Sequence, residues 1–170
     1  MGFYTEIFIK LQLKKDTPQH VVDICRMLFE GTPKEKYERK QQMPDFPDHP
    51  FFECQRWDYI GTLTQSYDPV TCMRQVMAYT DEGDENTLVP TGEWEIVSLN
   101  ELKDYGNEIE LFFNWIAPYA VPMNGFVGYA MTEEQDIPSR FFYVTHKKGE
   151  ATQSVHVLNV PQPTENLPRI

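Results

Sequence analysis

Hydrophobic and polar residues alternate with period two through residues 3–13. This pattern predicts a strand with one buried face, because successive side chains of a strand point to opposite sides of the sheet. Two aromatic residues, Tyr4 and Phe8, lie on the second face, which indicates that this face is not fully solvated. The face expected to be buried carries Phe3, Thr5, Ile7, Ile9, Leu11 and Leu13.

The next segment changes to a helical period and predicts a helix that ends at Gly31. Asp16 or Thr17 is expected to cap it, and Pro18 suits its first turn. Cys25 lies on the apolar face, where it is expected to be an inert core thiol. That face, at spacings i, i+3, i+4 and i+7, consists of Val21, Ile24, Cys25 and Leu28.

The most apolar stretch, residues 93–119, predicts a strand over 93–99, a polar turn and a second helix. Asn107 is the expected N-cap, Glu108 is expected on the solvent side with Glu110, and Pro118 is expected to end the helix. Such a wide apolar face is usually core, and a partner-binding helix is the alternative. The face carries Ile109, Phe112, Phe113 and Ile116.

The segments that connect each predicted helix to the strand before it are similar. Lys15 and Asp16 precede the first helix as Lys103 and Asp104 precede the second. Each unit is therefore a strand, a polar turn and a helix of similar length. Either an internal duplication or two solutions to one packing problem accounts for this similarity.

The middle of the chain breaks these patterns. Residues 32–50 are charged and then proline-rich, which predicts a long surface arm. Residues 51–64 and 70–80 are rich in β-forming residues and predict two strands, with Gly61 marking a bulge in the first. Residues 81–86 predict an acidic turn.

The last third predicts a hairpin of strands 125–131 and 141–147, then a strand over 153–160 that is suited to a sheet edge. We therefore expect a single α+β domain over residues 1–160, with a flexible arm at about 32–50 and a disordered tail at 161–170. The expected fold is a mainly antiparallel sheet with two helices on one face. A ferredoxin-like arrangement is the leading topology.

The composition narrows the range of functions expected for this chain. The chain of 170 residues has a net charge of −11, which disfavours direct binding to nucleic acid. No run of 18 apolar residues predicts a membrane span, and the N-terminal residues do not resemble a signal peptide. Three scattered cysteines, Cys25, Cys54 and Cys72, are typical of a reduced cytoplasmic protein with free thiols.

Catalytic motifs with recognised spacing are not found in the sequence, and no metal or other cofactor is expected. The polar residues near 45–56 are the weak candidates for a binding site, since carboxylates and imidazole can ligate divalent cations, but their spacing matches no known metal motif. A catalytic pair of Cys54 or Cys72 with His146 or His156 is formally possible. The weak candidates are Asp45, Asp48, His49, Glu53 and Arg56.

The segments LKKDTP, at 13–18, and KDYGNEIELFFNWIAPY, at 103–119, resemble an uncharacterised group of small bacterial and phage-borne proteins. The resemblance covers about a third of the chain, through core and turn residues. It implies a shared fold and carries no activity over. The chain departs from the group by its longer arm at 32–50 and its extended C-terminus.

Two functional hypotheses follow. The first is a non-enzymatic cytoplasmic protein of phage or mobile-element origin that binds a protein or a small molecule. An acidic inhibitor that mimics nucleic acid is one version of it. The second is a small hydrolase or transferase with a site near residues 45–56, which requires titratable groups to converge in a deep pocket. The oligomeric state, the ligand and the partner are left open by the sequence.

Overall fold

The computed structural model describes residues 3–62, 71–80, 87–121, 125–146 and 152–161, and it has an α+β fold. Six strands form one sheet in the order β2-β3-β1-β4-β5-β6, and every pair of neighbours is antiparallel. The mainly antiparallel sheet expected from the sequence is confirmed. The strands are β1 Thr5–Leu13, β2 Thr71–Thr80, β3 Thr87–Leu102, β4 Phe126–Thr132, β5 Arg140–Thr145 and β6 Ser154–Asn159.

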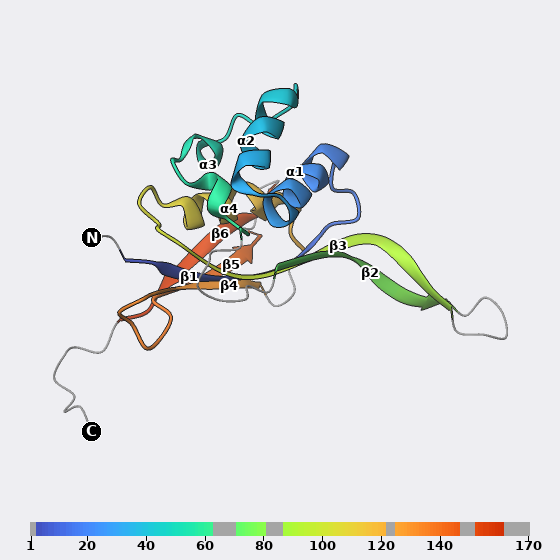
Figure 1. Cartoon of the computed structure of the whole chain (residues 1–170). Helices are drawn as coiled ribbons and strands as arrows, with labels where there is room; N and C mark the ends of the chain where they lie inside the picture. The colour runs from blue at the N-terminus through green and yellow to red at the C-terminus, as the bar shows by residue number, and fades with distance from the viewer. Residues whose placement is uncertain (1–2, 63–70, 81–86, 122–124, 147–151, 162–170) are drawn as a thin grey trace.

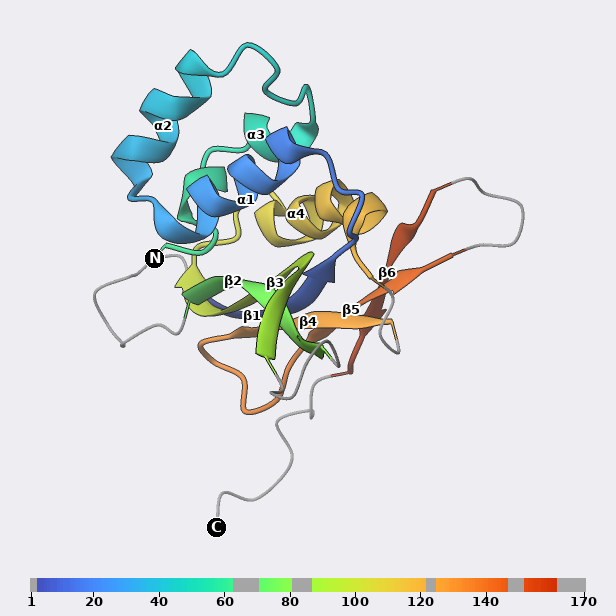
Figure 2. The same ribbon diagram turned by 90° about the vertical axis from the view of Figure 1, so that its right-hand side faces the viewer.

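The helices lie above the sheet in Figure 1, and the second view in Figure 2 agrees with this placement. They number four in the described part of the chain, so two more are present than the sequence patterns predict. No helix there is long and apolar enough to cross a membrane. They are α1 Gln19–Glu30, α2 Pro33–Gln42, α3 Pro50–Glu53 and α4 Glu108–Ile116, with 3-10 turns at Trp57–Tyr59 and Ala117–Tyr119.

The alternation in β1 has the expected result. Its odd positions from 5 to 13 are buried beneath the helices, whereas the even positions are partly or fully exposed. The hairpin β4–β5 and the edge position of β6 are also as predicted. The predicted turn at 81–86 and most of the predicted tail, 162–170, lie outside the described residues.

Both predicted helices bury their apolar faces. In α1, Val21, Ile24, Cys25 and Leu28 are all buried. The ends differ from expectation, since Pro18 occupies the N-cap of α1 without a side-chain cap, and Gly31 closes it with an extended backbone. The second helix, α4, ends at Ile116, before Pro118, as predicted, and the chain continues as a 3-10 turn over Ala117–Tyr119.

The start of α4 corrects two sequence expectations. Asn107 is at the N-cap, but its backbone is left-handed (φ 59°) and its side chain makes no cap. The Asp104 side chain instead accepts a hydrogen bond from the backbone N–H of Ile109 at 3.2 Å. Glu108, expected on the solvent side, is fully buried and accepts from the backbone N–H of Gly106 at 2.7 Å. A buried carboxylate needs such donors, and the turn before the helix supplies one to Oε2, whereas Oε1 is buried without a hydrogen-bond partner.

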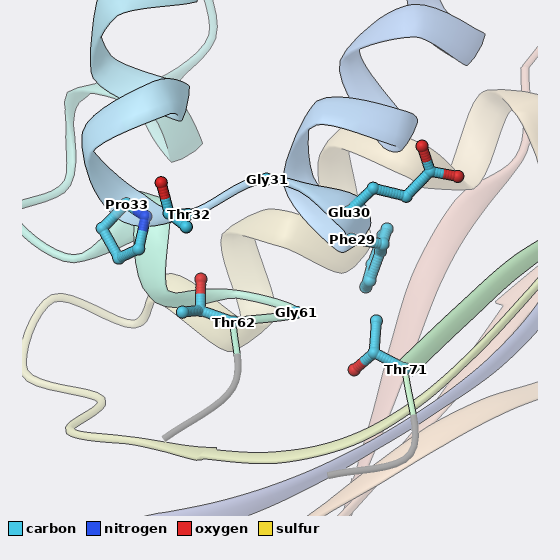
Figure 3. A pocket seen from close by; sticks show the side chains of 8 residues that line it. All are labelled: Phe29, Glu30, Gly31, Thr32, Pro33, Gly61, Thr62 and Thr71. Carbon is cyan, nitrogen blue, oxygen red and sulfur yellow. The ribbon is translucent and has the colours of Figure 1, made fainter. Parts of the chain in front are cut away.

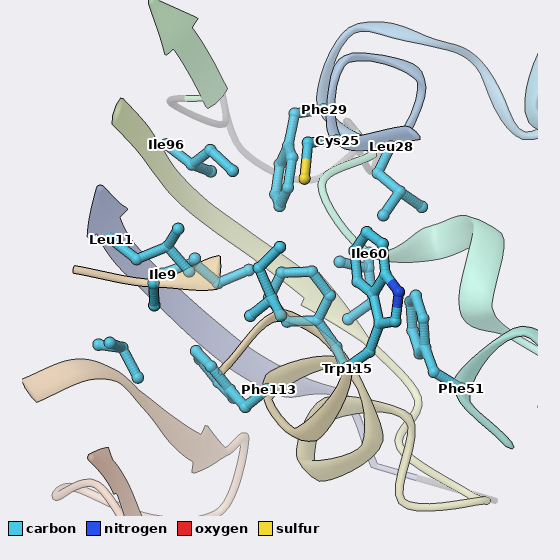
Figure 4. Close-up of a cluster of buried hydrophobic side chains, with 14 of the residues drawn as sticks. Ile9, Leu11, Cys25, Leu28, Phe29, Phe51, Ile60, Ile96, Phe113 and Trp115 are labelled. Carbon is cyan, nitrogen blue, oxygen red and sulfur yellow. The ribbon is translucent and has the colours of Figure 1, made fainter. Parts of the chain in front are cut away.

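The core fills the space between helices and sheet, as Figure 4 shows for part of it. Aromatic side chains from α3 and α4 meet there, with the ring centroids of Phe51 and Phe112 5.6 Å apart and those of Phe52 and Trp115 5.0 Å apart. Phe113 of α4 stacks at 4.4 Å on Phe142 of β5. The first two contacts join α3 to α4, and the third joins α4 to β5 of the sheet.

Residues 32–62 are where the sequence prediction is wrong. Much of the expected arm is the helix α2, whose Thr32 forms a capping box with Glu35. In place of the expected strand over 51–64, the described part of this segment, 51–62, contains α3 and a 3-10 turn, with Phe51, Phe52 and Trp57 buried. Gly61 is therefore no strand bulge; it has φ +70° and lies against the ring of Phe29. The expected mobility of the arm stays a prediction.

The hairpin of β2 and β3 extends beyond the helices, as Figure 1 shows. β1 pairs with β3 only from Trp94 to Leu102, so the outer part of β3 has β2 as its one described neighbour. The β2–β3 register shifts between Gln75 and Met77, close to where this two-stranded part begins. Met77, Tyr79 and Leu88 on this hairpin are exposed.

Candidate functional site: the open face of the sheet

The five weak candidates from the sequence do not form one site. Asp45 and Asp48 are exposed in the connection after α2. His49 caps α3 by accepting the backbone N–H of Phe51 at 3.2 Å, and burial lowers its pKa. Glu53 pairs with Lys40 at 3.5 Å. Within the described residues, no group of three or more acidic, histidine or cysteine side chains could hold a metal ion.

Arg56 has a role in packing. Its guanidinium lies 5.5 Å from the ring centre of Tyr59 and 5.1 Å from that of Tyr105. These contacts hold the 3-10 turn against the loop before α4. Cys54 and Arg56 lie between α3 and this turn, where the sequence predicts a strand over 51–64.

The three cysteines are free, as predicted. Burial raises the pKa of Cys25, which agrees with an inert core thiol. Burial, followed by the nearby Glu108, Asp104 and Glu53, also raises the pKa of Cys54. Cys72 is exposed on β2, but the side chain of the neighbouring cation Arg74 is bound to Glu95 at 2.6 Å.

A buried lysine, missed by the sequence patterns, joins α2 to the chain after the 3-10 turn. The Lys36 Nζ donates to the backbone oxygens of Asp58 and Ile60, at 2.7 and 2.8 Å, and to the hydroxyl of Thr62. Burial lowers the pKa of Lys36 to about 7, and the Asp58 carboxylate opposes this effect. Three acceptors surround the Lys36 Nζ, so Lys36 links α2 to residues 58–62 and is not a free amine.

Two concave regions do not bring reactive groups together. One, with a volume of about 240 Å³, contains a single ionisable side chain, that of Glu30. Figure 3 shows its lining, in which Phe29 and Thr71 point toward one another. The other, of about 360 Å³, adjoins the hairpin and is lined by Gln12, Arg74, Gln75, Val76, Met77 and Glu95. Its two charged residues, Arg74 and Glu95, are already paired with each other.

The side of the sheet opposite the helices is a second feature that could act as a site. No described helix lies over this open face (Figures 1 and 2). The strand register places one apolar residue from each of five neighbouring strands side by side. We call this the apolar row; it consists of Leu99, Phe8, Tyr129, Phe141 and Leu158, in the order β3, β1, β4, β5, β6.

Ring contacts connect the centre of the apolar row. Phe8 stacks on Tyr129 with ring centres 5.4 Å apart, and Tyr129 lies 6.5 Å from Phe141. Phe126 and Tyr143 extend this aromatic surface along β4 and β5. The end residues remain open to solvent, since Leu99 is 37% and Leu158 is 48% exposed.

Three carboxylates lie at one end of the open face. Glu6 of β1 is directly opposite Glu101 of β3, and Glu133 follows β4. We call Glu6, Glu101 and Glu133 the acidic end. Burial, then Glu6, then Glu133, raises the pKa of Glu101. The Tyr129 hydroxyl donates to Glu6 at 2.8 Å, so the acidic end adjoins the apolar row.

Burial and this hydrogen bond to Glu6 raise the pKa of Tyr129 to about 12. Tyr129 is therefore a neutral hydrogen-bond donor at physiological pH. The open face as a whole combines aromatic rings, a neutral phenol and carboxylates, and the exposed cation Lys10 lies two residues beyond Phe8 on β1, away from Glu6. It offers apolar contact along the apolar row and negative charge at the acidic end.

Comparison of the chain with family models, with curated proteins and with solved structures finds no match.

Part of the open face can be predicted from the sequence. Tyr4 and Phe8 on the second face of the first strand are the visible signal. The row itself could not be found, because residues 8, 99, 129, 141 and 158 meet only through the strand order and register.

Proposed function

We propose that this chain is a non-enzymatic cytoplasmic binding protein that docks a segment of another protein on its open face. The observation that carries the proposal is the apolar row, which crosses five strands without a described helix over it. Monomeric soluble proteins rarely leave large contiguous apolar surface exposed unless it is used. Aromatic side chains are also the residue type that most often dominates the energy of an interface.

The proposed fold of the binding unit is ferredoxin-like. Two observations support it. When α2, α3 and the 3-10 turns are set aside, the element order is β1, α1, β2, β3, α4, β4. The sheet order over the same strands is β4-β1-β3-β2, with antiparallel neighbours. In this proposal β5 and β6 extend the unit beyond β4 and widen its open face. The resemblance of residues 13–18 and 103–119 to phage-borne proteins supports an origin in phage or another mobile element.

A protein partner is favoured over nucleic acid. Single-stranded nucleic acid stacks on aromatic sheets where cations also track its phosphates. Here the aromatic row adjoins Glu6, Glu101 and Glu133, and the whole chain has a net charge of −11. Phosphates would be repelled at the place where bases would have to stack.

The test is selection of binding peptides followed by matched substitutions. A library of displayed random decapeptides is selected on the wild-type protein, and affinities of individual peptides are measured by titration calorimetry. Phe141→Ala and Tyr129→Ala should each weaken binding by about tenfold or more, as expected for truncated interface aromatics. Tyr37→Ala is the control, because Tyr37 is a 58% exposed aromatic residue on α2.

The proposal is wrong if no peptide is selected above background. It is also wrong if the open-face variants bind as tightly as the wild type. Circular dichroism and a denaturation curve for each variant distinguish a lost contact from a lost fold.

A further inference from the structure

The charge on the open face restricts what can occupy it. Glu6 and Glu101 are cross-strand neighbours, and like charges directly opposite one another destabilise a sheet. None of the ion pairs formed by the described residues includes Glu6, Glu101 or Glu133. The nearby cation Lys103 lies over the ring of Tyr4, at 4.9 Å from its centre. Glu6 accepts a hydrogen bond from the Tyr129 hydroxyl. Glu133 accepts one from the backbone N–H of Tyr4. The acidic end therefore has hydrogen-bond donors but no paired cation among the described residues.

The distance between the acidic end and the apolar row sets the distance between a cationic and an apolar side chain in a bound peptide. Glu6 precedes Phe8 by two residues on β1, and Glu101 follows Leu99 by two residues on β3. The two rows are thus separated by about 6.6 Å along the strands, twice the rise per residue. Side chains at i and i+2 of an extended peptide are the same distance apart on one side of it.

We propose that the open face takes an extended segment of a partner protein in which a lysine or arginine stands two positions from an apolar residue. This inference rests on the proposed function and names the chemistry of its partner. The apolar side chain lies on the row formed around Phe8 and Tyr129, and the cation lies at Glu6 and Glu101. The methylene groups of the lysine or arginine contact the aromatic rings, and its charge is neutralised by the carboxylates.

Other occupants fit the charge less well. A second copy of this chain has the same net charge of −11 and presents the same acidic end, so two open faces repel each other. An acidic or phosphorylated peptide meets the same repulsion. A neutral apolar peptide fits the apolar row but does not reduce the repulsion between the carboxylates of Glu6 and Glu101.

The test uses three pools of displayed decapeptides. In each pool Phe, Leu or Trp alternates with one class of residue: Lys and Arg, Ser and Gln, or Asp and Glu. Enrichment is measured on the wild-type protein at 50 mM and 300 mM NaCl. The basic pool should be enriched at least tenfold over the neutral pool at low salt, and this ratio should fall at high salt.

The double variant Glu6→Gln/Glu101→Gln should bring the ratio of basic to neutral pools close to one. Glutamine keeps an acceptor for the Tyr129 hydroxyl, so the aromatic surface is retained. Glu30→Gln/Glu38→Gln is the matched control, since it changes the net charge equally through two partly exposed residues of α1 and α2. This control should keep the preference for the basic pool.

Each result decides between the proposals. Equal enrichment of neutral and basic pools on the wild type overturns the cationic partner and leaves the binding face standing. No enrichment of any pool, or enrichment that survives Phe141→Ala and Tyr129→Ala, overturns both. Dimerisation at 100 µM that Phe141→Ala abolishes identifies a second copy as the occupant. Enrichment that appears only after deletion of residues 162–170 identifies the chain's own end; either result overturns the partner segment.

Discussion

The two faces of the sheet are built from the same strands but follow different chemical rules. On the helical side, β1 contributes Ile7 and Ile9, which are fully buried. On the open side, the same strand contributes Glu6, a partly exposed Phe8 and an exposed Lys10. The first set satisfies the packing of a core. The second set mixes aromatic rings with charges that face one another, and folding alone does not require that mixture.

Under the proposed function, stability depends mainly on the helical side of the sheet and binding on the open side. Substitutions on the helical side should mainly change the free energy of unfolding. Substitutions on the open side should change it less, because the surroundings can relax into solvent and fewer contacts are lost.

The largest expected difference is between two phenylalanines. Phe112→Ala, in the aromatic cluster of α4, should lower the free energy of unfolding by about 3–5 kcal/mol, since it leaves a cavity. Phe141→Ala, in the apolar row, should cost less than half as much. Urea denaturation followed by circular dichroism measures both, and equal costs would remove the distinction between the faces.

The second test concerns the helical layer and its pH dependence. The folded-state pKa of Lys36, about 7, lies below the unfolded value of 10.5, so the unfolded chain binds more protons between these values. Stability should therefore rise with pH through this window, by about 1 kcal/mol between pH 7.5 and 8.5. Denaturation curves at the two pH values measure the rise.

Lys36→Met is the matched variant, because it keeps the apolar stem and removes the titrating group. It should flatten the rise between pH 7.5 and 8.5, whatever its effect on stability at a single pH. A wild-type protein whose stability is constant or falls over that interval would contradict the burial effect at Lys36.

The smallest expected difference between the two faces is in the accessibility of their cysteine thiols. Cys25 lies under the helical layer, and Cys72 lies on the open side of β2, opposite Val97. Cys72 should react with a maleimide at pH 7 at least a hundred times faster than Cys25, and Cys54 should be intermediate. Mass spectrometry of the labelled native protein gives the rates. Fast labelling of Cys25 would show that the core opens readily.

Most of the sheet and both long apolar helices could be predicted, because their patterns reflect burial directly. Helix α2 could not be, since its one buried residue is Lys36 and its other positions are polar. Its capping box, Thr32 with Glu35, was visible in the sequence and is the signal that could have found it. At Phe51 and Phe52 a high β-propensity was overruled by packing, with Pro50 marking the helix start.

The candidate site was less predictable than the fold. Alternation alone shows that Phe8 points away from the core, but it does not show which side chains lie beside it. Leu158 is 150 residues away in sequence and lies in the same row through three intervening pairings. Sequence spacing contains no information about such a register unless the turns between strands are also determined.

The hydrogen-bonded pairing of the projecting β2–β3 hairpin should be less stable locally than the pairing in the rest of the sheet. β1 is paired along its length with β3 and over its first half also with β4, whereas Leu88 and Val89 pair with β2 alone. A two-stranded ribbon is only marginally stable by itself. The amide hydrogens of the outer part of this hairpin should therefore exchange through local opening, whereas those of β1 should exchange only through global unfolding. The hairpin can separate and re-form while the rest of the sheet stays folded.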